Sequence, residues 1–175
     1  MNIFVTDEDP VQSAIELCDQ HCRSKMQIES AILLQHCFDN KTLLEAPPTK
    51  KGEARKSGKG YFNHPCAAWV RESKVNFEWL VVHTLRMFDE RDFRWPKSES
   101  HFTKTFIEWC KENVNKTSDC KGNKLTPFAI AISEDKNCRK LKDFDKLSVI
   151  EKYRLYIKHD KPFATWTVRQ KPDWY

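Results

Sequence analysis

The stretch YFNHPCAAWVRESKVNFEWLVVHTLRMFDERDFRW, residues 61–95, decides the fold class. Pro65 suits the first turn of a helix, with Asn63 or His64 as its cap. Apolar residues then recur at helical spacing over about 25 residues, which predicts a long amphipathic helix with one buried face. The residues on this stripe are Trp69, Val70, Phe77, Leu80, Val81, Leu85 and Phe88.

Three more segments have the same period. The first runs from Val11 to about Phe38, with a kink near Arg23–Ser24, and the last ends at about His159. Between them, residues 98–114 predict a helix capped by Ser98 or Ser100 that buries Phe102, Phe106, Ile107, Trp109 and Cys110. Residues 3–5 form a short strand or a buried N-terminal segment. Because no repeat or linker divides the chain, we expect one compact, mainly α domain of about four helices over residues 1–175.

The composition excludes several classes of protein. No apolar run approaches the roughly 20 residues that cross a bilayer, and no signal peptide follows Met1, so we expect a soluble, cytoplasmic protein without membrane partners. Seven dispersed cysteines favour reduced thiols. Only four glycines are present, and the common phosphate-loop, dinucleotide, zinc-protease and serine-hydrolase motifs are absent. The net charge of +5 permits a polyanionic partner.

Residues 45–60, EAPPTKKGEARKSGKG, predict a flexible basic loop. Five Lys and Arg residues alternate with small residues, so the segment has little to bury. It is either a solvated insertion or a mobile clamp on phosphate groups.

Residues 18–30, CDQHCRSKMQIES, contain two rival sites. Cys18, His21 and Cys22 share one helix face and could bind zinc, but no fourth ligand follows, and both cysteines also fit the apolar stripe. The residues therefore predict no metal and no cofactor, with a small zinc-binding domain kept as an alternative.

The second site is the polar row of His21, Lys25 and Glu29, which drifts only about 40° per step around the helix. Glu29 borders apolar residues, where a carboxylate is suited to general acid–base catalysis. A buried ion pair and an ordinary charged surface are the alternatives.

Basic and aromatic residues elsewhere suit a nucleic acid or nucleotide ligand. His64 precedes a helix start, where backbone N–H groups favour anions, and we expect it to join His21 and Glu29 in catalysis. The expected substrate-binding residues are Lys25, Asn63, Trp69, Arg71, Arg91, Arg94 and Lys97.

Two of these stretches resemble a known family. ELCDQHCRSKMQIES resembles the first helix of the phage pyrimidine-dimer DNA glycosylases of the endonuclease V type, and KGYFNHPCAAWVR is similar to a segment of their bacterial relatives. The resemblance covers roughly residues 12–97. The whole chain also resembles tailed-phage proteins that open with NIF-x-x-DEDP.

The resemblance implies a compact helical domain that flips a nucleotide out of the duplex and forms an imine through its N-terminal amine. It implies that Glu29 is the catalytic carboxylate, with His21, Asn63 and His64 nearby. The chain departs from the family pattern at Asn2, which follows Met1 in place of a small residue, and at Ile28 and Ile32, which replace expected arginines.

Together these features predict a phage-encoded enzyme, located in the host cytoplasm, that acts on the N-glycosidic bond of pyrimidine nucleotides in DNA or free. The alternative from another class is a non-enzymatic phage accessory protein that binds nucleic acid or a host protein.

Overall fold

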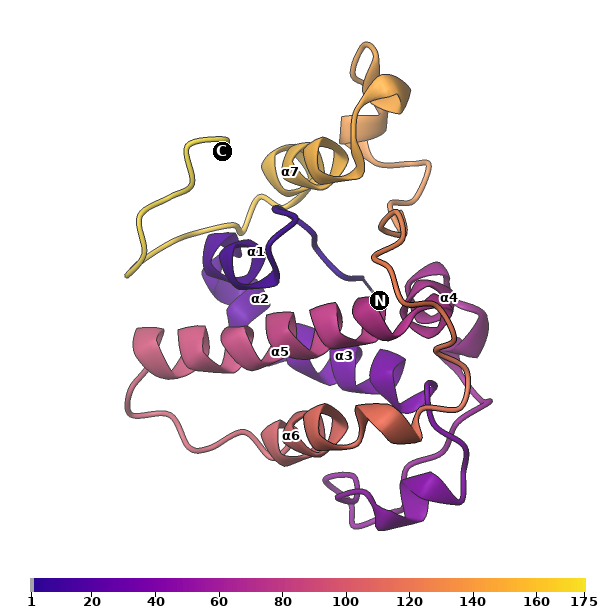
Figure 1. Ribbon diagram of the computed structural model, residues 1–175. Helices are drawn as coiled ribbons and strands as arrows, with labels where there is room; N and C mark the ends of the chain where they lie inside the picture. The colour runs from indigo at the N-terminus through magenta and orange to yellow at the C-terminus, as the bar shows by residue number, and fades with distance from the viewer. Residues whose placement is uncertain (1) are drawn as a thin grey trace.

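Helix α5 (Lys74–Arg94) crosses the middle of the molecule, and most other helices pack around it (Figure 1). The computed structural model describes residues 2–175, which form seven α-helices, five short 3₁₀ turns and no strand. Helices α1 (Pro10–Glu16), α2 (Asp19–Arg23), α3 (Lys25–Gln35), α4 (Pro65–Glu72) and α6 (Lys104–Glu112) all contact α5. Helix α7 (Val149–Asp160) lies beyond the N-terminal segment at the top of the view.

The expected mainly α class is confirmed, but the expected number of about four helices is wrong. The apolar run from Val11 to Phe38 is divided at Leu17–Cys18, whose backbone is extended, and again at Ser24. The helix expected after Pro65 is divided at Ser73, which is also extended. The Ser73 hydroxyl accepts hydrogen bonds from the backbone N–H groups of Val75 and Asn76, so it ends α4 and caps α5.

The remaining expected elements differ in detail. Helix α6 begins at Lys104, later than the expected cap at Ser98 or Ser100, and Phe102 therefore lies outside it and is 40% exposed. Phe106, Ile107 and Cys110 are buried as expected. Residues 3–5 are a buried segment, and none of the described helices is long and apolar enough to cross a membrane.

A buried charge cluster fastens the last part of the chain to the helices. Glu90, whose side chain is fully buried, accepts hydrogen bonds from the guanidinium groups of Arg86, Arg94 and Arg169. Arg94 also binds Asp19 at 3.1 Å. These bonds tie α2 and α5 to the C-terminal segment, residues 161–175, which runs over α1 and α2 without regular structure.

Two indole groups continue this attachment. Trp166 Nε1 donates to the Glu16 carbonyl at 3.0 Å, and Trp174 Nε1 donates to the Glu16 carboxylate at 2.7 Å. The Asp19 carboxylate accepts two further bonds from Thr167, both at 2.8 Å. The C-terminal segment is thus held along its length, and this fixes its first residues beside α2.

Candidate active site

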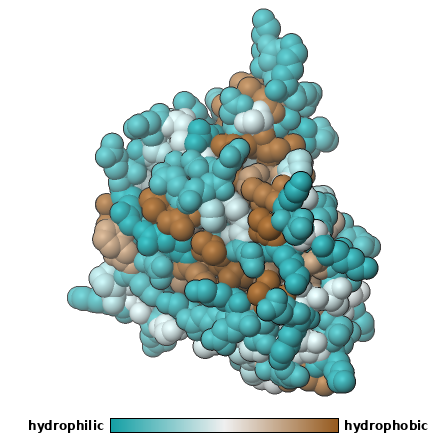
Figure 2. Space-filling model, viewed as in Figure 1, coloured by the Kyte–Doolittle hydropathy of each residue, from teal (hydrophilic) through white to brown (hydrophobic). Residues whose placement is uncertain are grey.

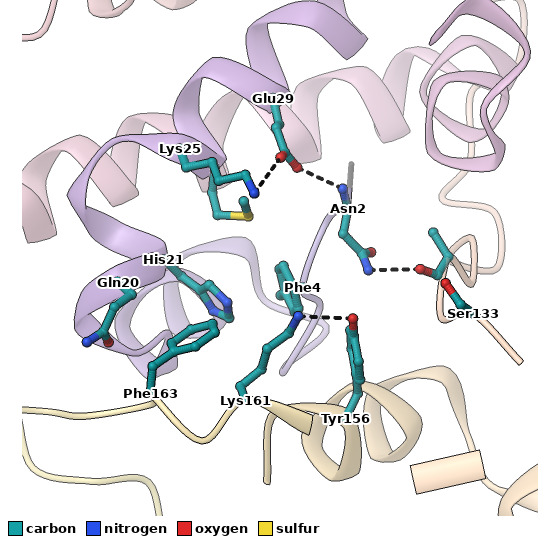
Figure 3. A pocket seen from close by; sticks show the side chains of 12 residues that line it. Asn2, Phe4, Gln20, His21, Lys25, Glu29, Ser133, Tyr156, Lys161 and Phe163 are labelled. Atoms are coloured by element: carbon teal, nitrogen blue, oxygen red, sulfur yellow. Dashed lines mark hydrogen bonds and ion pairs between the residues drawn. The ribbon is translucent and has the colours of Figure 1, made fainter. Parts of the chain in front are cut away.

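A cavity of about 280 Å³ lies where the N-terminal segment meets α3 and the end of α7 (Figure 3). Its walls come from the N-terminal segment, α2, α3, residues 131–133, the end of α7 and the start of the C-terminal segment. This volume is near the lower limit of ligand pockets, which begin at roughly 300 Å³. The lining residues are Asn2, Phe4, Gln20, His21, Lys25, Met26, Glu29, Ala131, Ser133, Tyr156, Lys161 and Phe163.

Glu29 projects from α3 into this cavity, with 14% of its side chain exposed. One carboxylate oxygen accepts a hydrogen bond from the backbone N–H of Asn2 at 3.0 Å. The other lies 3.9 Å from Nζ of Lys25, which is itself 79% exposed. The carboxylate is therefore fixed in direction while one side of it faces the cavity.

Asn2 is anchored from the opposite side. Its side-chain amide donates to the Ala131 carbonyl at 3.1 Å, and its amide oxygen accepts from the Tyr153 hydroxyl at 2.7 Å. The same hydroxyl accepts from the Ala131 backbone N–H. Because Tyr153 is fully buried, this network holds the backbone of Asn2 rigidly against Glu29.

His21 forms part of the aromatic wall. Its ring stacks on Phe4 at 4.1 Å between centroids and meets the edge of Phe163 at 6.0 Å. Burial, helped by the charges of Lys161 and Lys25, lowers the pKa of His21 to about 3. Its Nδ1 atom has no hydrogen-bond partner within residues 2–175. At neutral pH, His21 is thus an uncharged imidazole in the cavity wall, and it does not supply an imidazolium.

Lys161 brings a second cation to the cavity. Its ammonium group donates to the Tyr156 hydroxyl at 3.0 Å and lies 5.5 Å from the centroid of the Phe4 ring. Figure 3 shows it directed towards the centre of the cavity from the side opposite Lys25. The cavity therefore combines one fixed carboxylate, one neutral imidazole, two ammonium groups and an aromatic wall.

Of the residues expected from the sequence, His21, Lys25 and Glu29 line this cavity together. His64 caps α4 through Nδ1, which accepts from the backbone N–H of Cys66, and it does not line the cavity. Burial lowers the pKa of His64, and the charge of Glu29 opposes that effect. Asn63 is exposed on the turn before His64.

The other expected substrate-binding residues lie elsewhere. Trp69 is in the core, where its indole donates to the Thr126 carbonyl, and Arg94 belongs to the buried Glu90 cluster. Arg91 binds the Arg23 carbonyl, and Lys97 is exposed beyond α5. Arg71 donates to the Phe62 carbonyl at 2.7 Å.

The site residues expected from the sequence do not include Asn2, Tyr156, Lys161 or Phe163, although Tyr156 and Lys161 belong to the aromatic and basic residues that suit a nucleic acid. The KPF sequence at 161–163, a cation and an aromatic ring directly after a helix end, was the available signal for two of them. Nothing local connects them to α3, because the cavity forms only when segments from both ends of the chain meet.

The zinc-binding alternative rests on Cys18, His21 and Cys22. Cys18 and Cys22 are fully buried, and Cys22 Sγ faces the Ala14 and Leu17 carbonyls. Within the described part of the chain, no group of three or more His, Cys, Asp or Glu residues is placed to bind a metal ion.

Comparison of the chain with protein-family models, curated proteins and solved structures finds no match in any of the three. The expected glycosylase-like fold thus has no support from a solved structure. The part of the hypothesis that concerns the amine of Met1 lies outside the described residues.

Proposed function

We propose that this cavity is the active site of an enzyme that cleaves the N-glycosidic bond of a pyrimidine nucleotide, in DNA or free, with Glu29 as the catalytic carboxylate. The observation that carries the proposal is the placement of Glu29, fixed between Asn2 and Lys25 at the wall of a cavity that also contains His21. The resemblance of residues 12–97 to pyrimidine-dimer glycosylases, in which a glutamate of the first helix is catalytic, supports the same residue.

The chemistry requires a fixed negative charge. Glycoside cleavage develops positive charge on the sugar, and a carboxylate held beside C1′ stabilises it. In hydrolysis, a water oxygen bonds to C1′ and its proton passes to Glu29, while the C1′–N1 bond breaks and its electron pair leaves with the base. Glu29 suits this role because its hydrogen bond to Asn2 is formed before substrate arrives.

The remaining groups suit the substrate. The ammonium groups of Lys25 and Lys161 can pair with phosphate, and the Phe4 and Phe163 rings can contact a planar base. A neutral His21 can hydrogen-bond the base and orient it. We therefore give His21 the role of positioning the base and not of transferring a proton.

The test is base release by Glu29→Gln against a matched control. Glu78→Gln makes the same change on the exposed face of α5. The substrates are pyrimidine nucleosides, their monophosphates, and oligonucleotides containing normal, deaminated or dimerised pyrimidines, and released base is measured by chromatography. We expect Glu29→Gln to lose about 10²- to 10⁴-fold in turnover, the usual contribution of a general acid or base, and Glu78→Gln to retain it.

Two results contradict the proposal. One is full turnover by Glu29→Gln. The other is the absence of base release by the wild-type protein on every substrate; if such a protein still binds oligonucleotides, the non-enzymatic binding alternative replaces the enzyme.

A further inference from the structure

A second cavity, of about 760 Å³, lies at the other end of α3. We call it the basic groove and define it by Ile32 and Gln35 of α3 and by Arg55, Lys56, Lys59 and Tyr61. Lys56 and Lys59 are exposed and form no ion pair within residues 2–175. One acidic residue, the exposed Glu53, also lines the groove. In Figure 2, the surface around the 45–60 loop is mainly hydrophilic, unlike the hydrophobic band over α5.

The loop that carries these lysines is attached to the protein. The Arg55 guanidinium lies 3.7 Å from the centre of the Phe106 ring, and its Nε donates to the Pro47 carbonyl at 3.0 Å. The backbone N–H of Ser57 donates to the Asn40 side chain at 2.8 Å. Lys56 therefore lies between two anchored neighbours, Arg55 and Ser57, which fix the position of its backbone.

An exposed aromatic ring ends the groove. Tyr61 is 54% exposed, and the turn that carries it is held by Arg71, which stacks on the Phe62 ring at 3.7 Å. An exposed ring beside free ammonium groups is the combination that binds unpaired bases and phosphates of single strands.

The groove and the candidate active site are both lined by residues of α3. Ile32 of the groove lies three residues after Glu29, so the two are neighbours on the helix surface. Gln35 lies about 9 Å along the helix axis from Glu29 and about 120° around it. His64 is next to the groove, because its ring is 6.3 Å from that of Tyr61.

We propose that the basic groove binds the backbone of a single-stranded DNA, one nucleotide of which enters the cavity at Glu29. Lys56 and Lys59 contact phosphates, and Tyr61 stacks on a base next to the reacting nucleotide. The inference rests on the proposed function and names its substrate class, a polymer and not a free nucleotide.

The test compares two double variants that remove equal charge. Lys56→Ala/Lys59→Ala empties the groove of its free cations, and Lys140→Ala/Lys142→Ala removes two exposed lysines on the distant turn before α7. Binding of a fluorescent dT oligonucleotide is measured by anisotropy over a range of salt concentrations. Each lost phosphate contact lowers the salt slope by about 0.7 for a single strand, so we expect the groove variant to lose about 1.4 and the control to lose none.

Tyr61 supplies an independent readout. We expect Tyr61→Ala to weaken dT binding by about 5- to 150-fold without changing the salt slope, and Tyr61→Phe to bind normally, because stacking needs only the ring. We also expect a duplex of the same sequence to bind at least about tenfold more weakly, since its bases are not free to stack.

The inference is overturned if the wild-type protein does not bind the oligonucleotide, if the two double variants have the same slope, or if the duplex binds as well as the single strand. None of these results affects base release by Glu29 from free nucleotides. Conversely, groove-dependent binding together with full activity of Glu29→Gln rejects the proposed active site and leaves the groove in place.

Discussion

Replacing Glu90 by glutamine removes the central charge of the buried cluster and keeps the side-chain shape. Glu90 and Arg94 have fully buried side chains, and Glu90 pairs with Arg86, Arg94 and Arg169. A glutamine amide has only one acceptor oxygen and turns an N–H group towards the guanidinium donors. In the variant, Arg94 keeps Asp19 as a partner. Asp19 is then the one carboxylate left beside the guanidinium groups that Glu90 and Asp19 face together in the wild type.

The expected loss in the free energy of unfolding is about 3–5 kcal/mol, the usual effect of breaking a buried ion pair from one side. That is a large fraction of the roughly 5–15 kcal/mol that stabilises a domain. It corresponds to a fall in Tm of about 6–20 °C for a chain of this length. Urea unfolding followed by circular dichroism measures the difference, with Glu78→Gln on the same helix expected within about 0.5 kcal/mol of the wild type. A loss below about 1 kcal/mol would refute the reasoning.

The same variant has a defined pH dependence. Burial raises the pKa of Glu90, but the hydrogen bonds and charges of Arg169 and Arg94 together outweigh it and hold this pKa below its ordinary value. The folded state therefore binds fewer protons, and the stabilisation is fully present above the ordinary glutamate pKa of about 4.3 and is lost as the pH falls through the lower folded value. The difference between wild type and Glu90→Gln should narrow below about pH 4, and a difference that widens there contradicts the assignment.

Three further changes test other parts of the fold. Burial lowers the pKa of His83, which is buried and has no hydrogen-bond partner on either ring nitrogen within residues 2–175, to about 3. Below about pH 6.5, the unfolded state binds a proton on His83 that the folded state does not bind, so the wild type loses stability as the pH falls. In urea titrations, the free energy of unfolding of His83→Leu should therefore rise by roughly 3 kcal/mol relative to that of the wild type between pH 8 and pH 4.5. An equal pH profile for the two proteins would contradict this. Tyr153→Phe removes the hydroxyl that Asn2 and the Ala131 N–H use, and a loss of about 1–3 kcal/mol in unfolding free energy is expected, with no loss as the opposing result. Ser148→Ala opens the capping box with Glu151 at the start of α7 and should reduce stability by about 0.5–2 kcal/mol in thermal melts, while Ser148→Asp should retain it.

The helical class was predictable from the sequence because it depends on local periodicity. The helix breaks at Leu17–Cys18 and Ser73 were not, since the helical spacing of the apolar residues continues across both positions although the backbone there is extended. Ser73 in particular depends on a tertiary partner, because its hydroxyl donates to the Lys124 carbonyl, 51 residues away. Local pattern therefore indicates which residues are helical more reliably than where each helix ends.

The residues of the candidate site also divide into those that local sequence indicates and those that depend on distant partners. The row of His21, Lys25 and Glu29 was predictable because all three belong to one stretch of about three turns. Arg94 illustrates the opposite case: it was expected to bind substrate, and its partner Asp19 lies 75 residues away, so nothing near it in the sequence indicated a buried ion pair. In the sequence, an arginine next to aromatic residues looks the same whether it binds a substrate or forms a buried ion pair.

The contacts between the N-terminal part of the chain and residues beyond 150 have a consequence for the order of folding. The bonds between Asn2 and Tyr153, Glu16 and Trp166, and Asp19 and Thr167 each close a loop of about 150 residues. Contacts between α3, α4, α5 and α6 span much shorter loops, and shorter loops close with less loss of chain entropy. We expect the α3–α6 body to form first and the walls around Glu29 to close last. Amide protons around the cavity should accordingly exchange through local opening at a lower free energy than the amide protons of α5. Mild denaturant should then open the candidate site before it unfolds the molecule.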